Sequence, residues 1–224
     1  MSAAASRRRF APVLLVLFGL ASACAKGPQA WKSDLSDADP FVRGMAAIGL
    51  ALAGPAHVAD ALPELLRTID ATHVGLEREA AFVLSRVGPT HAPALLEVLV
   101  GVELPTEDRK GAIKNALVAG GAEVVPAIVK CMRGPGSQRV GDLGDVLLAI
   151  GAPAAPELAD LLNQEADVRL RRFAAFLLGR LGPRGVAARG ALEAALADED
   201  PELRAVAAAA LRAMGPGSLG GGAR

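Results

Sequence analysis

The side chains that most often carry catalysis or bind metals are few in this sequence. It holds three histidines and two cysteines among 224 residues. His57, His73 and His91 each fall beside a predicted turn, and none pairs with another at the spacing that puts two ligands on one helix face. No Gly-x-Ser-x-Gly, no His-Glu-x-x-His and no phosphate-binding glycine loop that opens a helix is present. The sequence therefore predicts no enzyme, no metal and no cofactor.

Cys131 lies within VVPAIVKCM, where apolar residues recur at helical spacing. A reactive thiol needs a neighbouring base or cation, and Lys130, although adjacent in sequence, points to another side of a helix. Cys131 is therefore expected to be a small core residue. It has no disulfide partner if Cys24 is acylated.

The N-terminal residues have the order of a secretory signal. Arg7 to Arg9 precede the apolar run APVLLVLFGL, which is too short to span a bilayer, and small residues follow. Ala21-Ser22-Ala23 fits ordinary signal peptidase, and before Cys24 it also resembles a bacterial lipobox, in which the cysteine becomes a lipidated first residue. We expect residues 1–23 to be removed, Cys24 to be lipidated and residues 24–33 to tether the protein to a membrane of the bacterial envelope.

Alternatives remain open for export. An ordinary cleavage site that happens to precede Cys24 would leave a soluble periplasmic or secreted protein. The stretch Ser6-Arg7-Arg8-Arg9-Phe10 also resembles a twin-arginine export signal. Either route leads out of the cytoplasm.

The charge balance argues against nucleic acid as a partner. Basic and acidic residues number 24 each, and removal of Arg7 to Arg9 leaves 21 against 24, a net charge near −3. Nucleic-acid binding depends on a concentrated basic face. The small cluster of Arg169, Arg171 and Arg172 is interpreted as a solvated helix edge with one structural arginine. The acidic run 198–200 is interpreted as a helix start.

One phrase occurs near both ends of the chain. DADPFVRGMAAIGLALAGP begins at Asp37, and DEDPELRAVAAAALRAMGP begins at Asp198, 161 residues later (198 − 37). If five units of about 32 residues fill that distance, the glycine that ends the phrase must recur at this period. It does, at Gly54, Gly88, Gly120, Gly151, Gly182 and Gly215. The phrase is therefore a repeat unit.

Each unit has the local chemistry of a helix hairpin. Asp39 and Asp200 can cap a helix, and a proline follows each at the first helical position. The recurring glycine supplies a left-handed residue that ends the helix. One hairpin cannot bury its apolar face, whereas stacked hairpins can. The sequence predicts an all-α solenoid over residues 34–214 and a flexible Gly-rich tail at 215–224.

The expected elements are five helix pairs, at about residues 36–70, 72–101, 104–133, 136–164 and 166–197, and a C-terminal capping helix at about 199–214. The first helix of the fourth pair should be short, frayed or locally mobile, because GPGSQRVGDLGD places four glycines where it would begin. Trp31, in the expected tether, should pack under the first pair.

The pattern Asp-x-x-Val/Leu-Arg-x-x-Ala-Ala-x-x-Leu-x-x-x-Gly, followed by Pro-x-Leu-x-x-Leu-Leu, resembles a HEAT repeat, close to the short form in phycobilisome-lyase-type repeat proteins. The resemblance covers roughly residues 34–214. It implies hydrogen-bonded ladders of aspartate and arginine between successive units. The arginines that would form them here are Arg43, Arg78, Arg109, Arg171 and Arg204.

Stacked hairpins without catalytic motifs favour a non-enzymatic scaffold that binds a protein partner, whose identity the sequence does not reveal. The face lined by the second helices is the expected binding surface. Its candidate polar contacts are Glu64, Arg67, Glu97, Lys130, Arg133, Glu157, Asp160, Arg189 and Glu193. The phenylalanines lie on first-helix stripes and are expected in the core, which would leave the surface without aromatic anchors.

The lyase-type resemblance implies one alternative, a protein that handles a bilin-like chromophore or another ligand. An apolar groove with converging polar groups would favour ligand handling. A continuous shallow face would favour protein binding.

Overall fold

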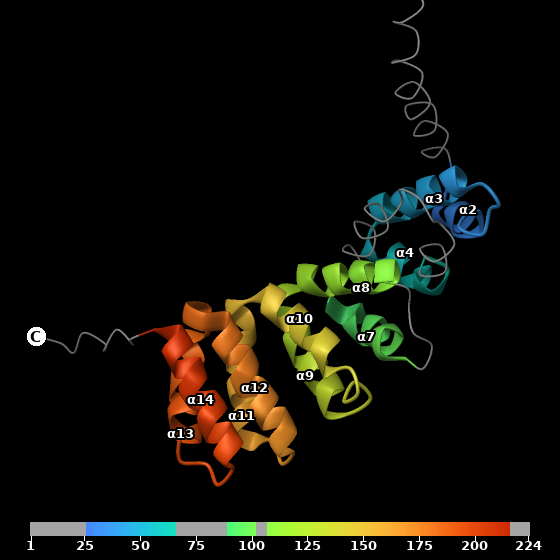
Figure 1. Cartoon of the computed structure of the whole chain (residues 1–224). Coiled ribbons are helices and arrows are strands. Elements are labelled where there is room, and N and C mark those ends of the chain that lie inside the picture. Colours follow the sequence, from blue (N-terminus) through green and yellow to red (C-terminus); the bar gives the residue numbers. More distant parts are fainter. Residues whose placement is uncertain (1–25, 66–88, 102–106, 216–224) are drawn as a thin grey trace, which may run out of the picture. The chain divides into compact units, whose positions relative to one another are not determined.

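The computed structural model describes residues 26–65, 89–101 and 107–215, and every regular element within these ranges is a helix (Figure 1). It confirms the predicted all-α solenoid of helix hairpins. The chain divides into two compact units, Met1–His91 with Pro105–Ala116 and Ala92–Leu104 with Leu117–Arg224. Several predicted features lie outside the described residues, namely the signal peptide, Cys24, Arg67, His73, Arg78, Gly88 and the tail from 216.

In the first unit, α2 (Pro28–Asp34), α3 (Pro40–Ala53) and α4 (Pro55–Asp60) follow one another. Helix α3 begins as predicted. The carboxylate of Asp39 accepts a hydrogen bond from the Phe41 N–H at 2.8 Å, and Pro40 fills the first helical position. The local signals of the repeated phrase are therefore sufficient to start this helix.

The expected tether, residues 24–33, is partly helical, because its residues 28–33 belong to α2, which packs on α3. Gly49 makes this packing close, since a Cβ there would lie 2.7 Å from Cε2 of Trp31. Lys32 Nζ donates to the Asp60 carbonyl at 2.8 Å and to its Oδ2 at 3.0 Å. The Trp31 indole and the Lys32 ammonium thus hold α2 against the rest of the first compact unit.

Helix α8 (Glu107–Ala119) belongs to the first unit as far as Ala116 and to the second beyond it. The 3-10 turn η1 (Pro89–His91) lies in the first unit. Arg109 lies on α8, and its side chain is outside what the structure describes. None of the described helices is by itself long and apolar enough to span a membrane; the bent pair Lys110–Ala119 and Gly121–Arg133 meets that test only together, by length and composition.

The second unit consists of two rows of helices. The first-helix row is α10 (Val140–Ile150), α12 (Val168–Leu181) and α14 (Pro201–Met214). The second-helix row is α7 (Ala92–Val100), α9 (Val125–Arg133), α11 (Ala155–Gln164) and α13 (Arg189–Ala195). The 3-10 turns η2 (Gly121–Val124), η3 (Ala152–Ala154) and η4 (Gly182–Ala188) lead into the second helices.

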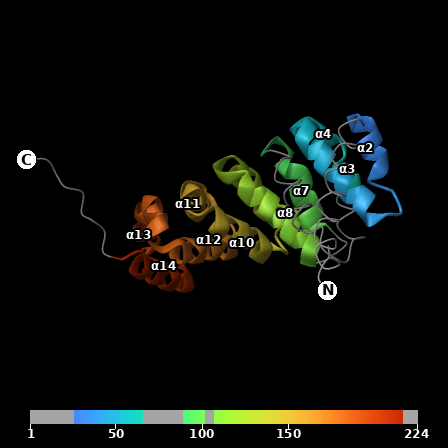
Figure 2. The same cartoon turned by 90° about the horizontal axis from the view of Figure 1, so that it is seen from above.

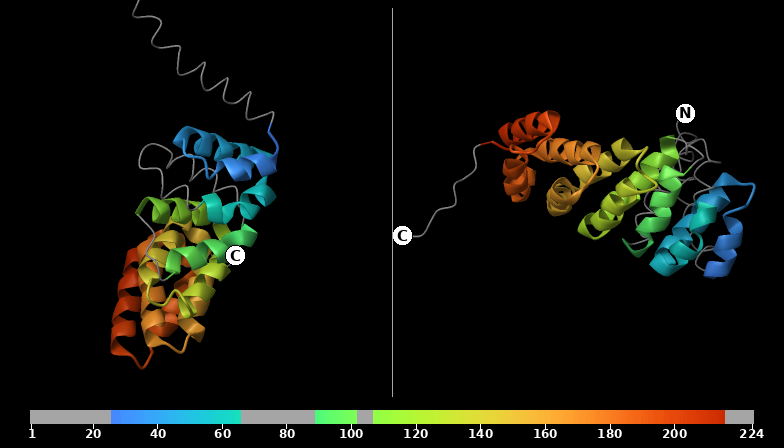
Figure 3. Two further views of the ribbon diagram at one scale, coloured as in Figure 1. Left: turned by 90° about the vertical axis from the view of Figure 1, so that its right-hand side faces the viewer. Right: turned by 90° about the horizontal axis from the view of Figure 1, so that it is seen from below.

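Each helix of the second unit packs on the next member of its own row, α10 on α12 and α12 on α14 in one, α7 on α9, α9 on α11 and α11 on α13 in the other. Figures 1 and 2 show the α13–α14 pair beside the α11–α12 pair. In Figure 3 the colours run from yellow-green to red through α9 to α14 in sequence order. This is the neighbour-to-neighbour packing that the repeat predicts.

Glycines with positive φ follow the first helices of the repeats directly. The φ angle is 121° at Gly54, 84° at Gly151, 56° at Gly182 and 76° at Gly215, a region that strains any residue with a Cβ. The third repeat differs from the prediction, because Gly120 has a φ of −69° and Gly121, at 58°, is the left-handed residue. Two glycines stand together here, and the repeat period pointed to the first of them.

The core of the second unit lies between its two rows. Its largest fully buried side chains include Leu143, Leu147, Leu158, Leu161 and Leu177, and burying such a side chain stabilises by about 1.5–3 kcal/mol. Small residues allow neighbouring helices of the first-helix row to pack closely. A Cβ on Gly179 would lie 3.0 Å from Cα of Ala210 on the next helix. The alanine- and glycine-rich stripes of the repeat are therefore packing devices.

Helix α10, the first helix of the fourth repeat, has 11 residues, against 14 in α12 and in α14, so it is short as predicted. It begins at Val140, because the chain first turns tightly against the end of α9. There the Gly136 N–H donates to the Cys131 carbonyl at 2.8 Å, and a Cβ on Gly136 would lie 2.9 Å from Cys131 Sγ. The glycines thus have a steric role at this turn.

Candidate protein-binding surface

The predicted binding residues that the structure describes lie on second helices, as expected. Glu97 lies on α7, Lys130 and Arg133 on α9, Glu157 and Asp160 on α11, and Arg189 and Glu193 on α13, all in the second unit. Glu64 lies in the first unit, in the helical residues after α4. Five of these side chains are exposed: Glu97, Lys130, Arg133, Asp160 and Glu193.

Several of the predicted contact residues are occupied within the chain, among them Arg133 and Arg189. Arg133 Nε donates to Glu165 Oε2 at 2.9 Å, from the end of α9 to the end of α11. A guanidinium nitrogen of Arg189 donates to the Gly215 carbonyl at 2.5 Å, from α13 to the end of α14. Both arginines join successive units, so their first role is to hold the stack together.

A groove of about 780 Å³ runs along α7 and α9 in the second unit. Apolar side chains line it, among them Pro93, Leu96, Val100, Ala127 and Pro135. The predicted contact residues Glu97, Lys130 and Arg133 stand at the same groove. The second-helix face is thus hollowed at one place, where apolar surface and charges of both signs meet.

Cys131 also lines the groove, with only 8% of its surface exposed. Burial raises the pKa of its thiol above the ordinary value, and a hydrogen bond from the Gly136 backbone opposes this only in part. A buried thiol with a raised pKa is protonated at neutral pH and a poor nucleophile. The expectation of a small core residue agrees with this burial.

The arginine ladder differs from the pattern that the resemblance implied. Arg43 donates to the carbonyls of Asp37 and Ala38 at 2.8 and 3.0 Å, and Arg204 donates to those of Asp198 and Glu199 at 2.8 and 2.9 Å. Each pair of bonds lies within one repeat and closes the loop before its first helix, α3 or α14. The backbone carbonyls are reached because the capping turn points them back along the helix.

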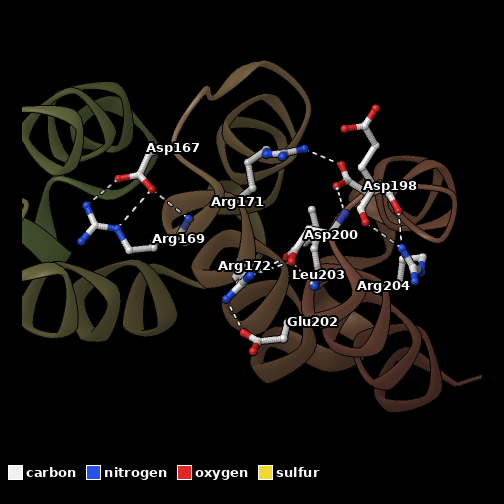
Figure 4. A network of polar contacts seen from close by, with 10 residues as sticks. Asp167, Arg169, Arg171, Arg172, Asp198, Asp200, Glu202, Leu203 and Arg204 are labelled. Atoms are coloured by element: carbon white, nitrogen blue, oxygen red, sulfur yellow. Dashed lines mark hydrogen bonds and ion pairs between the residues drawn. The ribbon is translucent and has the colours of Figure 1, made fainter.

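Among the ladder arginines whose side chains the structure describes, Arg171 reaches the next repeat, where it pairs with the Asp198 carboxylate (Figure 4). Asp198 Oδ1 also accepts the Asp200 N–H at 2.9 Å. The acidic run therefore has two roles: Asp200 caps α14 as predicted, accepting from the Leu203 N–H at 2.8 Å, and Asp198 receives an arginine from α12.

Arg172 is a contact that the sequence did not predict. Its Nε and one terminal nitrogen donate to the two oxygens of Asp200 at 2.5 and 2.6 Å, and the other terminal nitrogen pairs with Glu202 (Figure 4). The side-chain hydrogen bonds from Arg172 hold the pKa of Asp200 below its usual range. The signal was available, because Arg172 stands one unit before an acidic helix start, but the cluster was interpreted as solvated.

The histidines offer no metal site within the described ranges. His57 and His91 lie in the first unit at α4 and η1, and no group of three potential metal ligands occurs in the part of the chain that the structure describes. The expectation of no metal stays a prediction.

The phenylalanines correct one prediction. They were expected in the core, but Phe41 is 45% exposed and Phe176 is 46% exposed. On α12 the spacing of three between Phe173 and Phe176 puts both at the edge of the buried stripe, whose centre is taken by alanine and leucine. Aromatic side chains are therefore present on the surface of the second unit.

Residues 155–219 match the family model for HEAT repeats. The matched part of the chain is therefore similar to HEAT repeats. It contains α11 to α14, so the Arg171 and Arg172 contacts lie within the matched residues. Helices α7, α9 and α10 extend the same two rows toward the N-terminus.

Among solved structures, the chain is similar to human deoxyhypusine hydroxylase in complex with glycerol, with 21% identity over 85% of this chain and 74% of that chain and a TM-score of 0.42. It is also similar to an engineered protein (20% identity, 85% and 58% coverage, TM-score 0.35) and to a designed armadillo repeat protein (16%, 84% and 100%, 0.34). Likenesses this distant carry no argument about activity. No curated protein sequence matches the chain significantly.

Proposed function

We propose that this protein is a non-enzymatic scaffold that binds a segment of a partner protein in the groove along α7 and α9. The observation that carries the proposal is the coincidence of open apolar surface with the predicted charges Glu97 and Lys130. An apolar centre with a charged rim is the usual composition of a protein-binding site. The repeats supply a rigid second-helix row, so the groove exists before a partner binds.

Site-specific photo-crosslinking tests this proposal. A photoreactive amino acid at position 127, inside the groove, is compared with one at position 199, an exposed loop position away from it. In the native host, position 127 should yield a discrete protein adduct that position 199 does not, and mass spectrometry then identifies the partner. Equal adducts at both positions, or none at 127, would contradict the proposal.

We further propose that the scaffold is exported and held at the bacterial envelope by a lipid on Cys24. The arginines, the short apolar run and Ala21-Ser22-Ala23 before this cysteine support it. Mass analysis of the processed protein should show Cys24 as the first residue, with the added mass of acyl chains, and Cys24→Ser should move the protein from the membrane to the soluble fraction. An unmodified Cys24 in the processed protein would refute the anchor.

The groove also supports a second candidate, the handling of a bilin-like ligand, because about 780 Å³ falls in the size range of small-molecule sites. A titration of the purified chain with a bilin distinguishes the two. Under the scaffold proposal the absorption spectrum of the bilin stays unchanged. A saturable spectral shift that disappears in Ala127→Trp, which fills the groove, would favour ligand handling.

A further inference from the structure

We propose that the surface of α12 formed by Phe173, Phe176 and Arg180 is a second docking surface, which binds an acidic segment of a partner protein that also carries an apolar side chain. This aromatic patch lies on the first-helix row of the second unit, whereas the proposed groove lies on the second-helix row. If the patch proved to bind nothing, the proposal for the groove would still stand.

The first argument is the exposure of a large ring beside a well-made core. Leu177 and Leu178 are no more than 1% exposed, yet the neighbouring Phe176 ring leaves 46% of its surface open. Its ring stacks on that of Phe173 at 6.1 Å between centroids, with 25° between the planes. Aromatic residues, phenylalanine included, are enriched at protein interfaces relative to the rest of the surface. An aromatic ring buries much area with few rotatable bonds.

The second argument is that the patch is held in place. The Phe173 ring lies against Gly144 of α10, where a Cβ would come within 2.7 Å of its Cζ. Because Phe176 stacks on this supported ring, its position is fixed before any partner binds. Binding therefore costs little side-chain entropy.

The third argument is charge. The Arg180 guanidinium lies 5.8 Å from the centre of the Phe176 ring, and no ion pair of Arg180 is found among the described residues. By contrast, Arg169, Arg171 and Arg172 at the other end of the helix each pair with a carboxylate. Residues 168–192 contain no acidic residue. A partner with carboxylates beside its apolar side chain therefore matches the patch, since it can stack on Phe176 and pair with Arg180.

Peptide display tests this inference. Random 16-residue peptides are selected on the purified full-length chain, and the winners are tested against Phe176→Ala and Arg180→Glu. We expect enriched peptides that combine acidic and apolar residues and that lose at least about tenfold in affinity to each variant. Leu196→Ala, at another exposed apolar position (43%), is the matched control and should bind as the wild type does.

Other outcomes overturn the inference. Enriched peptides that are neutral or basic, peptides that bind Phe176→Ala unchanged, or no enrichment at all would each do so. Binding to vesicles with about 30% anionic lipid that depends on Phe176 would assign the patch to a membrane surface instead, because Arg180 would then meet lipid phosphates. A dimer that light scattering detects only when Phe176 is present would assign it to a second copy of this chain.

Discussion

At the scale of single residues, the chain uses its scarce reactive groups for structure. Cys131 is buried at the groove, and Arg172 donates hydrogen bonds to Asp200, which caps α14 in the next repeat. In both cases the surroundings set the protonation state. A carboxylate beside an arginine keeps its charge to lower pH, and a thiol removed from water keeps its proton to higher pH.

Cys131 should react with alkylating reagents only at high pH. Its raised pKa means that little thiolate is present at pH 8, and the core limits access, so the rate in the folded protein should be at least about tenfold below that of the urea-unfolded chain. The measurement is iodoacetamide labelling of a Cys24→Ser variant across pH 7–10, followed by mass spectrometry. Equal rates in both states would show that Cys131 is open to solvent.

Arg172→Ala should destabilise the protein at neutral pH and much less in acid. The folded pKa of Asp200 is depressed, so the pair stabilises above the ordinary aspartate pKa of about 3.9 and this contribution is lost as the pH falls through the lower folded value. Urea midpoints at pH 7 and at about pH 2.5 measure the effect. Arg212→Ala is the control, because Arg212 is exposed on α14 and has no ion pair among the described residues. A pH-independent loss for Arg172→Ala would contradict this account.

At the scale of elements, close approach at glycine decides which helices join. Helix α2 has only 7 residues, too few to be stable alone, and docks through Trp31 at Gly49. Its helical state therefore depends on a glycine in another element.

Gly49→Leu should release α2 from α3. The new side chain would occupy the space of the Trp31 ring, and Trp31 is the only tryptophan in a chain without tyrosine, so intrinsic fluorescence reports this contact alone. The emission maximum should shift to the red as the indole meets water. Gly111→Leu is the control, because a Cβ at Gly111 meets nothing within 4 Å, and it should leave the spectrum unchanged. An unshifted spectrum for Gly49→Leu would refute the docking.

At the scale of the whole molecule, stability is a sum of neighbour contacts. In a repeat array each unit packs chiefly on the next, so damage at one interface stays near it. The two compact units of this chain extend that expectation, because each has its own internal packing.

Gly179→Leu should destabilise the end of the array and spare its beginning. The side chain would strike Cα of Ala210, and such overpacking costs about 1–3 kcal/mol. Hydrogen–deuterium exchange should become faster in α12 and α14 and stay unchanged in α2 to α4. The control Gly141→Leu, on α10 with nothing within 4 Å of a Cβ, should leave exchange in α14 as in the wild type. Uniformly faster exchange would show that the chain unfolds as one block.

Sequence alone was sufficient for the helices, the hairpin period and the all-α solenoid, because caps, glycine turns and apolar spacing act within a few residues. Asp39, Pro40 and Gly54 illustrate this, since each does its work locally. The left-handed residue of the third unit was missed by one place for the same local reason, as two glycines stood together.

Only the tertiary structure decided which side chains meet across units. Arg172 pairs with Asp200, 28 positions away (200 − 172), and Trp31 meets Gly49, 18 positions away (49 − 31). The exposure of Phe176 depends on the packing of neighbouring helices. The groove arises in the same way, because α7 and α9 come from different repeats. Periodicity tells which face of a helix is buried, but the offset between stacked helices, which it does not contain, determines what that face touches.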